Sequence, residues 1–184
     1  MTTTIKENRL KDHIRDIPDY HKEGIIFKDI TTLLKEKKAF KESIDLLAEN
    51  FASEPIDYVV GVEARGFIFG AAMAYKLGAG FIPVRKKGKL PHKTKSVSYE
   101  LEYGTDELEI HEDAIPARAN VLIVDDLLAT GGTIKAVCDL VKSQQAVIAG
   151  VAFLVELGFL KGKDKLKDVP IYSVIKYYTY FYTY

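Results

Sequence analysis

The sequence has almost no cysteine and no long apolar run. Cys138 is the single cysteine among 184 residues, which excludes an internal disulfide and a zinc site built from cysteines alone. The longest apolar runs, such as residues 146–155, reach about ten residues, whereas a membrane helix needs ~20. The first ten residues, MTTTIKENRL, lack the apolar core of a signal peptide. We therefore expect a cytoplasmic protein with no membrane partner.

The sequence also lacks an excess of charge of either sign. Lys and Arg together number 26, and Asp and Glu together number 26. A net charge of zero argues against a nucleic-acid partner. The balance conceals two opposed blocks, because residues 85–95 hold six Lys or Arg and no acid, and residues 100–113 hold seven acids and no Lys or Arg. We expect this charge separation to mark a site.

Apolar periodicity predicts an α/β fold with a central, mainly parallel sheet flanked by helices. A chain of this length favours one domain, over residues 1–184. We expect helices over residues 39–52, 67–77 and 134–141, and strands over residues 58–62, 81–84, 121–124, 146–155 and 171–176. Residues 96–110 alternate polar and apolar around Gly104, which predicts an antiparallel hairpin of the kind that serves as a lid.

The most informative segment is VLIVDDLLATGGT, residues 121–133. Asp125 and Asp126 follow a short apolar strand, and a Thr-Gly-Gly-Thr turn then opens a helix. Backbone N–H groups at a helix start favour an anion, and glycine lets the backbone approach it closely. The acids suit hydroxyl groups, so a phosphorylated sugar fits both halves. Either half alone is more often a plain strand-to-helix turn, and the segment is neither a P-loop nor a GxGxxG fingerprint.

The same segment resembles the 5-phosphoribosyl-1-pyrophosphate (PRPP) motif of type I phosphoribosyltransferases. Four more segments resemble the adenine branch of that family, in order: GIIFKDI at residues 24–30, GVEARGF at 61–67, RKKGKLP at 85–91 and YELEYG at 99–104. The resemblance covers about residues 14–177. It implies a small hood over residues 14–34, a flexible lid over 86–112 and a tail over 178–184.

The resemblance also implies a role for each segment. The 5′-phosphate would be bound by Ala129, Thr130, Gly131, Gly132 and Thr133, and the ribose hydroxyls by Asp125 and Asp126. Pyrophosphate would be bound by Arg85 and Lys89. Adenine would lie against Ile25, Ile26 and Phe27. Arg65 would meet the pyrophosphate or the base, after a non-proline cis peptide at Glu63–Ala64. Glu102, on the lid, would be the catalytic acid/base for the proton on the adenine ring.

The implied reaction joins adenine to PRPP and yields AMP and pyrophosphate. Mg²⁺ would arrive bound to PRPP, since the sequence shows no all-protein metal site. The family resemblance also implies a homodimer.

One alternative is the same fold acting on hypoxanthine, guanine or xanthine. Another is a PRPP-sensing regulator without enzyme activity, although such regulators need a DNA-binding domain and only about 20 residues precede the hood motif.

Overall fold

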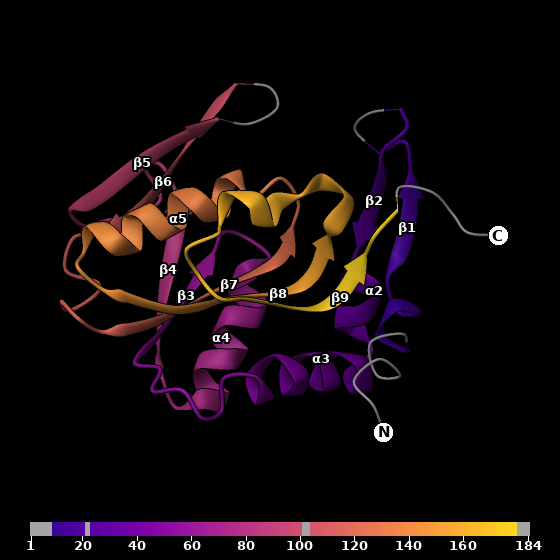
Figure 1. The fold of residues 1–184 in the computed structure, drawn as a ribbon, viewed down its shortest axis with the longest axis horizontal. Helices are drawn as coiled ribbons and strands as arrows, with labels where there is room; N and C mark the ends of the chain where they lie inside the picture. The colour runs from indigo at the N-terminus through magenta and orange to yellow at the C-terminus, as the bar shows by residue number, and fades with distance from the viewer. Residues whose placement is uncertain (1–8, 21–22, 101–103, 180–184) are drawn as a thin grey trace.

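In a computed structural model that describes residues 9–20, 23–100 and 104–179, seven strands form one sheet in the order β5-β6-β4-β3-β7-β8-β9 (Figure 1). Five neighbouring strands are parallel: β3 (Tyr58–Val62), β4 (Gly80–Lys86), β7 (Asn120–Leu128), β8 (Val147–Leu157) and β9 (Ile171–Tyr177). At one edge, β6 (Thr105–His111) pairs antiparallel with both β4 and β5 (Thr94–Glu100). The predicted fold class is confirmed.

Alternate residues of the central strands face opposite sides of the sheet, and both sets are buried. Val59 and Leu122 belong to the apolar cluster that includes α3 (Lys37–Glu49) and α4 (Gly66–Leu77). Val60 and Ile123 belong to the cluster that includes α5 (Gly132–Ser143), which lies on the other side of the sheet in Figure 1. Because helices exclude water from both faces, the paired central stretches of these strands, residues 58–62 of β3 and 121–124 of β7, are apolar.

The predicted helices and strands are all present, with ends that differ by a few residues. The difference that matters is in β7, which was predicted over residues 121–124 and continues to Leu128. Asp125 and Leu127 remain paired with Phe153 and Val155 of β8, so the ladder does not end at the acidic pair. The two acids therefore lie within the strand and not after it.

The hood region contains elements that the periodicity did not reveal. Strands β1 (Arg15–Pro18) and β2 (Ile26–Asp29) form a separate two-stranded antiparallel sheet, and α2 (Thr31–Lys35) follows. Lys28 holds this sheet in place, because its Nζ lies 2.6 Å from Asp16 Oδ1 and 4.2 Å from the centre of the Tyr177 ring. The hood thus rests against the end of β9.

The predicted hairpin is confirmed over the residues described. Ser98 of β5 pairs with Glu107 of β6, and Glu109 of β6 pairs with Arg85 of β4. Figure 1 shows this hairpin and the β1–β2 sheet rising on either side of the carboxyl ends of β7 and β8. A ligand at those strand ends would lie between hood and hairpin.

Two short 3₁₀ helices, η1 (Gly158–Leu160) and η2 (Gly162–Lys165), connect β8 to β9. In the part of the chain that the structure describes, no helix is both long enough and apolar enough to cross a membrane.

Candidate active site

Two adjacent carboxylates lie near the carboxyl end of β7. The Asp125 Oδ1 atom accepts a hydrogen bond of 2.8 Å from the Asp126 backbone N–H. Asp126 is buried, and its Oδ2 lies 2.8 Å from Nε of Arg65 in an ion pair. Gly66 opens α4 directly against this strand: a Cβ at Gly66 would stand 2.7 Å from Asp125 Oδ1 and 3.0 Å from Val124 O. Only glycine allows α4 to begin so close to the acids.

Both carboxyl groups are harder to ionise than an ordinary aspartate. Burial raises the pKa of Asp125, and the neighbouring Asp126 carboxylate raises it further. Burial also raises the pKa of Asp126, although the Arg65 guanidinium acts in the opposite direction. Carboxylates held this way gain most from hydrogen-bond donors or cations that a ligand brings, since these favour the charged form.

The Thr-Gly-Gly-Thr turn lines a small pocket beside the acidic pair. The pocket has a volume of about 80 Å³ and is lined by Asp125, Leu127, Leu128, Ala129, Thr130, Gly131, Gly132, Thr133 and Ile134. Gly131 is the N-cap of α5 and has a φ of 78°, in the left-handed region that favours glycine. The first N–H groups of a helix have no partner within the helix, so they can donate to an anion. The residues predicted to bind the 5′-phosphate therefore gather in one place.

The loop after β3 carries the second group of predicted residues. The Glu63–Ala64 peptide is cis, as expected. Glu63 accepts two hydrogen bonds of 3.2 Å from the Arg85 guanidinium and one of 3.0 Å from the Lys86 backbone N–H. Burial raises the pKa of Glu63, but these donors and the Lys89 charge outweigh it and hold the pKa below its usual range. Of the two cations predicted to meet pyrophosphate, Arg85 thus binds a carboxylate directly, and the charge of Lys89 acts on the same carboxylate.

The hood meets this loop through Arg65. The Arg65 guanidinium lies 5.3 Å from the centre of the Phe27 ring, and the Tyr20 ring packs against the same Phe27 ring with 4.9 Å between the ring centres. Ile25, Ile26 and Phe27 are half-buried. Arg65 therefore touches both the segment predicted to bind adenine and the acid predicted to bind ribose.

The hairpin approaches the turn that is predicted to bind the 5′-phosphate. A Cβ at Gly132 would stand 3.4 Å from the backbone O of Glu100. Burial raises the pKa of Tyr99, while a hydrogen bond with Thr133 acts to lower it. Glu102, the predicted acid/base, lies outside the described residues. Neither Tyr99 nor Glu63 was predicted to have a side-chain role, although both belong to segments that the sequence singled out.

The two charge blocks bind each other in part, which differs from the sequence-based interpretation. Lys86 Nζ lies 3.0 Å from Asp106 Oδ2, and Lys87 Nζ lies 2.7 Å from Glu107 Oε2. Glu109 is buried and accepts a 3.0 Å hydrogen bond from the Gly88 N–H. The cause is the antiparallel pairing of β4 with β6, which brings the blocks side by side.

No group of three or more His, Cys, Asp or Glu side chains is arranged to hold a metal ion within residues 9–20, 23–100 and 104–179. The acidic pair of β7 offers two carboxylates only. That donor set fits a hard cation that keeps water and substrate oxygens as its other ligands, because Mg²⁺ is usually held by one or two carboxylates together with phosphate oxygens.

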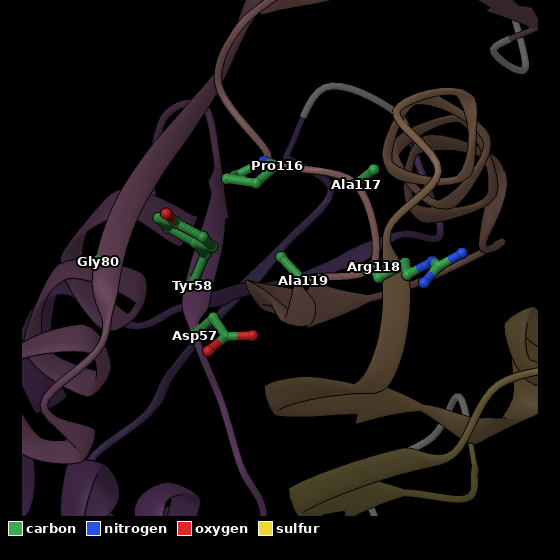
Figure 2. A pocket seen from close by; sticks show the side chains of 7 residues that line it. All are labelled: Asp57, Tyr58, Gly80, Pro116, Ala117, Arg118 and Ala119. Atoms are coloured by element: carbon green, nitrogen blue, oxygen red, sulfur yellow. The ribbon is translucent and has the colours of Figure 1, made fainter.

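A second hollow lies at the opposite end of the sheet (Figure 2). It has a volume of about 560 Å³ and is lined by Asp57, Tyr58, Gly80, Pro116, Ala117, Arg118 and Ala119. These residues lie at the amino ends of β3 and β4 and just before β7. Since parallel α/β sheets bind ligands at the carboxyl ends of their strands, this hollow is separate from the predicted site.

The comparisons with known proteins agree with this geometry. The protein-family model of the phosphoribosyl transferase domain matches residues 29–178 of this chain. The adenine phosphoribosyltransferase of Geotalea uraniireducens is 58% identical over 170 residues, which cover 92% of this chain and 99% of that protein.

Two solved structures are similar over nearly their whole length. The adenine phosphoribosyltransferase of Thermoanaerobacter pseudethanolicus has a TM-score of 0.90 and 54% identity, covering 92% of this chain and 99% of the other. The enzyme of Saccharomyces cerevisiae, solved with adenine and D-2,5-dideoxy-2,5-imino-altritol 1,6-bisphosphate, has a TM-score of 0.88 and 42% identity, covering 94% and 99%. The chain therefore belongs to the phosphoribosyltransferase family and, within it, to the adenine phosphoribosyltransferases, which are transferases of purine salvage.

Proposed function

We propose that this chain joins adenine to PRPP, and releases AMP and pyrophosphate, at the pocket between β7 and α5. The observation that carries the proposal is the meeting of three features in one place. Arg65 links the acidic pair of β7 to the hood residue Phe27, and Asp125 of that pair lines one pocket with the helix start at Gly131. The hood over residues 14–34 and the lid over residues 86–112 would belong to one phosphoribosyltransferase unit.

The binding roles follow from the chemistry of each group. Backbone N–H groups of Thr130 to Thr133 and the two threonine hydroxyls donate to the 5′-phosphate. Asp125 and Asp126 accept hydrogen bonds from the ribose hydroxyls, which offsets the cost of their burial. Ile25, Ile26 and Phe27 cover the face of adenine.

The reaction breaks the bond from ribose C1 to pyrophosphate and forms the bond from C1 to adenine. Positive charge develops on the ribose and negative charge on the leaving group. Arg85 and Lys89 stabilise the leaving pyrophosphate, and for this Arg85 exchanges its contacts with Glu63 for the ligand. Glu102 accepts the proton that leaves the adenine ring. Closure of the hairpin over the site excludes water, which would otherwise hydrolyse PRPP.

Magnesium is the proposed metal, and it enters with PRPP. Asp125 and Asp126 are the protein groups that would share it, because they are the carboxylates next to the proposed sugar site. When bound, the cation neutralises charge on the pyrophosphate as that group departs.

A base panel tests the proposal. The protein is incubated with PRPP, Mg²⁺ and radiolabelled adenine, hypoxanthine, guanine or xanthine, and nucleotide formation is measured. Adenine is expected to react fastest. Faster turnover of hypoxanthine would show that adenine is not the preferred base. Tight PRPP binding without turnover of any base would favour a PRPP-sensing regulator without enzyme activity. Omitting Mg²⁺ is expected to abolish turnover, and full activity in excess EDTA would exclude the metal.

We also propose that the chain forms a homodimer through the outer face of α4. Ile68 and Tyr75 lie seven residues apart on this helix and are 40% and 91% exposed, and Phe81, whose ring packs against Phe67 of the same helix, is 37% exposed. Exposed apolar side chains grouped in this way are typical of protein interfaces. In sedimentation velocity, Tyr75→Glu is expected to give monomers, while Val147→Glu, at an apolar residue that is 51% exposed in β8, is expected to leave the dimer intact. A monomeric wild type would refute the proposal.

A further inference from the structure

The phosphate-binding turn is in close backbone contact with the segment that follows β8. A Cβ at Gly162 would overlap the carbonyl O of Ala129 and stand 3.0 Å from the backbone N of Gly131. In the other direction, a Cβ at Gly131 would overlap the carbonyl O of Gly162 and stand 3.1 Å from its carbonyl carbon. Neither position has room for a side chain. The contact brings together two glycines that are far apart in the chain.

The segment on the far side of this contact is firmly anchored. Leu166, just after η2, is 3% exposed and belongs to the same apolar cluster as Leu128. Lys163 Nζ lies 2.9 Å from Oε2 of Glu156, a carboxylate that is buried at the end of β8. Glu156 is in turn the strand partner of Leu128. The anchors of η2 are therefore fixed to the strand from which the phosphate-binding turn departs.

The contact also orients donors of the turn. The peptide that joins Ala129 to Thr130 is trans, so its C=O and its N–H point in opposite directions. Because the Ala129 carbonyl faces Gly162, the Thr130 N–H faces away from η2. A side chain at Gly162 would push this carbonyl, and rotation of the peptide plane would turn the N–H with it.

We propose that Gly162 is a positioning residue for the 5′-phosphate: its bare Cα lets η2 support the turn over residues 129–133 in the conformation that binds the phosphate. The proposal rests on the proposed function, since it assumes that this turn holds the phosphate of PRPP and AMP. Gly162 itself does not touch the ligand. Its effect is on binding of the ribose 5-phosphate part, and adenine binding is not affected.

The test compares Gly162→Ala with the wild type by calorimetry, with ribose 5-phosphate as the probe, and by steady-state kinetics. Because a displacement of about 1 Å can cost on the order of 100-fold, Gly162→Ala is expected to weaken ribose 5-phosphate binding by about 10- to 100-fold. The KM for PRPP is expected to rise by a similar factor, while the KM for adenine changes by less than about twofold. A general loss of structure would give a different result. It would change both KM values, or it would lower the amount of folded enzyme and leave both KM values unchanged.

Two further variants separate the possible outcomes. Gly158→Ala is the matched control from the same connection, because a Cβ there would stand 3.3 Å from Tyr177 O and touches no part of the turn. It is expected to leave binding unchanged. Thr130→Ala/Thr133→Ala removes two proposed phosphate donors and is expected to weaken ribose 5-phosphate binding. Weakening in this double variant but not in Gly162→Ala overturns the positioning role alone. No weakening in either overturns the proposed phosphate site.

Lys163→Met keeps the proposal testable if Gly162→Ala does not fold. It removes one anchor of η2 at a side chain that is 40% exposed. Loss of such an ion pair is expected to weaken ribose 5-phosphate binding by about two- to fivefold. Amide hydrogen exchange at residues 129–133 is expected to accelerate. Unchanged exchange and unchanged affinity would overturn the inference.

Discussion

Replacing Arg65 with methionine should leave a buried carboxylate without its cation. Arg65 Nε and Asp126 Oδ2 are 2.8 Å apart, and the Asp126 side chain is only 7% exposed. Methionine fills a similar volume and still covers the Phe27 ring. The variant therefore removes the charge with little change in packing, so its effect measures the ion pair.

Two factors limit how much stability Arg65→Met loses: solvent screening of Arg65 and protonation of Asp126. Breaking a fully buried pair costs about 3–5 kcal/mol, but Arg65 is 39% exposed, so solvent already screens part of the attraction. Asp126 can also take up a proton, and for a carboxyl with the ordinary pKa of 3.8 this costs about 4 kcal/mol at pH 7. We expect Arg65→Met to lower the free energy of unfolding by about 1–3 kcal/mol at neutral pH.

The pH dependence gives the test its direction. Burial raises the pKa of Asp126 in the folded protein, and loss of Arg65 raises it further. The ionised carboxylate then opposes folding at neutral pH, and this cost disappears as the pH falls through the raised pKa towards the unfolded value. The difference between wild type and variant should therefore shrink as the pH falls from neutral towards the unfolded value of 3.8, as measured by urea unfolding.

The control is the double variant Arg65→Met/Asp126→Asn. Asparagine cannot ionise, so the double variant should recover most of the lost stability at neutral pH. A single variant that loses less than about 0.5 kcal/mol, or a loss that does not depend on pH, would show that Arg65 does not stabilise a buried charge.

Three other variants or measurements examine the site and the core. Glu102→Ala is expected to lower kcat by roughly 100-fold or more in the radiolabelled assay, and an unchanged kcat would remove Glu102 from the mechanism. Asp125→Asn/Asp126→Asn should weaken PRPP binding in calorimetry without unfolding the protein, and unaltered affinity would contradict the ribose assignment. Burial raises the pKa of the Cys138 thiol to about 11, so a thiol reagent near neutral pH should label it slowly in the native protein and rapidly in urea; fast native labelling would show that α5 is not packed as described.

Much of the fold was predictable because its central strands are buried on both faces. A strand such as β3 needs apolar residues at every position, and that composition is visible in one short run. The helix α5 shows the same clarity, since its buried residues Ile134, Val137 and Val141 recur at helical spacing. The hood was different. Strands β1 and β2 have four residues each and no fully buried side chain, so burial leaves no pattern in them.

The site was predictable where its residues are close in sequence. The acids of β7 and the turn at Gly131 form one continuous segment, and their proximity requires no long-range folding. The contact between Gly131 and Gly162 has no such local signal, because the sequence around Gly162 is an ordinary Lys-Gly-Lys and its partner is 31 residues away. Similarly, the ion pair of Arg65 with Asp126 depends on the pairing of β3 with β7.

The charge blocks illustrate how the fold divides one cluster of cations between two tasks. Lys86 and Lys87 are held by acids of β6, so they fasten the hairpin to β4. Arg85 instead contacts Glu63, in the loop that carries the cis peptide. Glu63 therefore occupies the position of an anion among cations proposed to bind pyrophosphate. An incoming pyrophosphate must compete with this carboxylate, and it carries more charge than Glu63 does. Glu63→Gln should consequently tighten pyrophosphate binding, because the glutamine keeps the side chain's length but no longer neutralises Arg85.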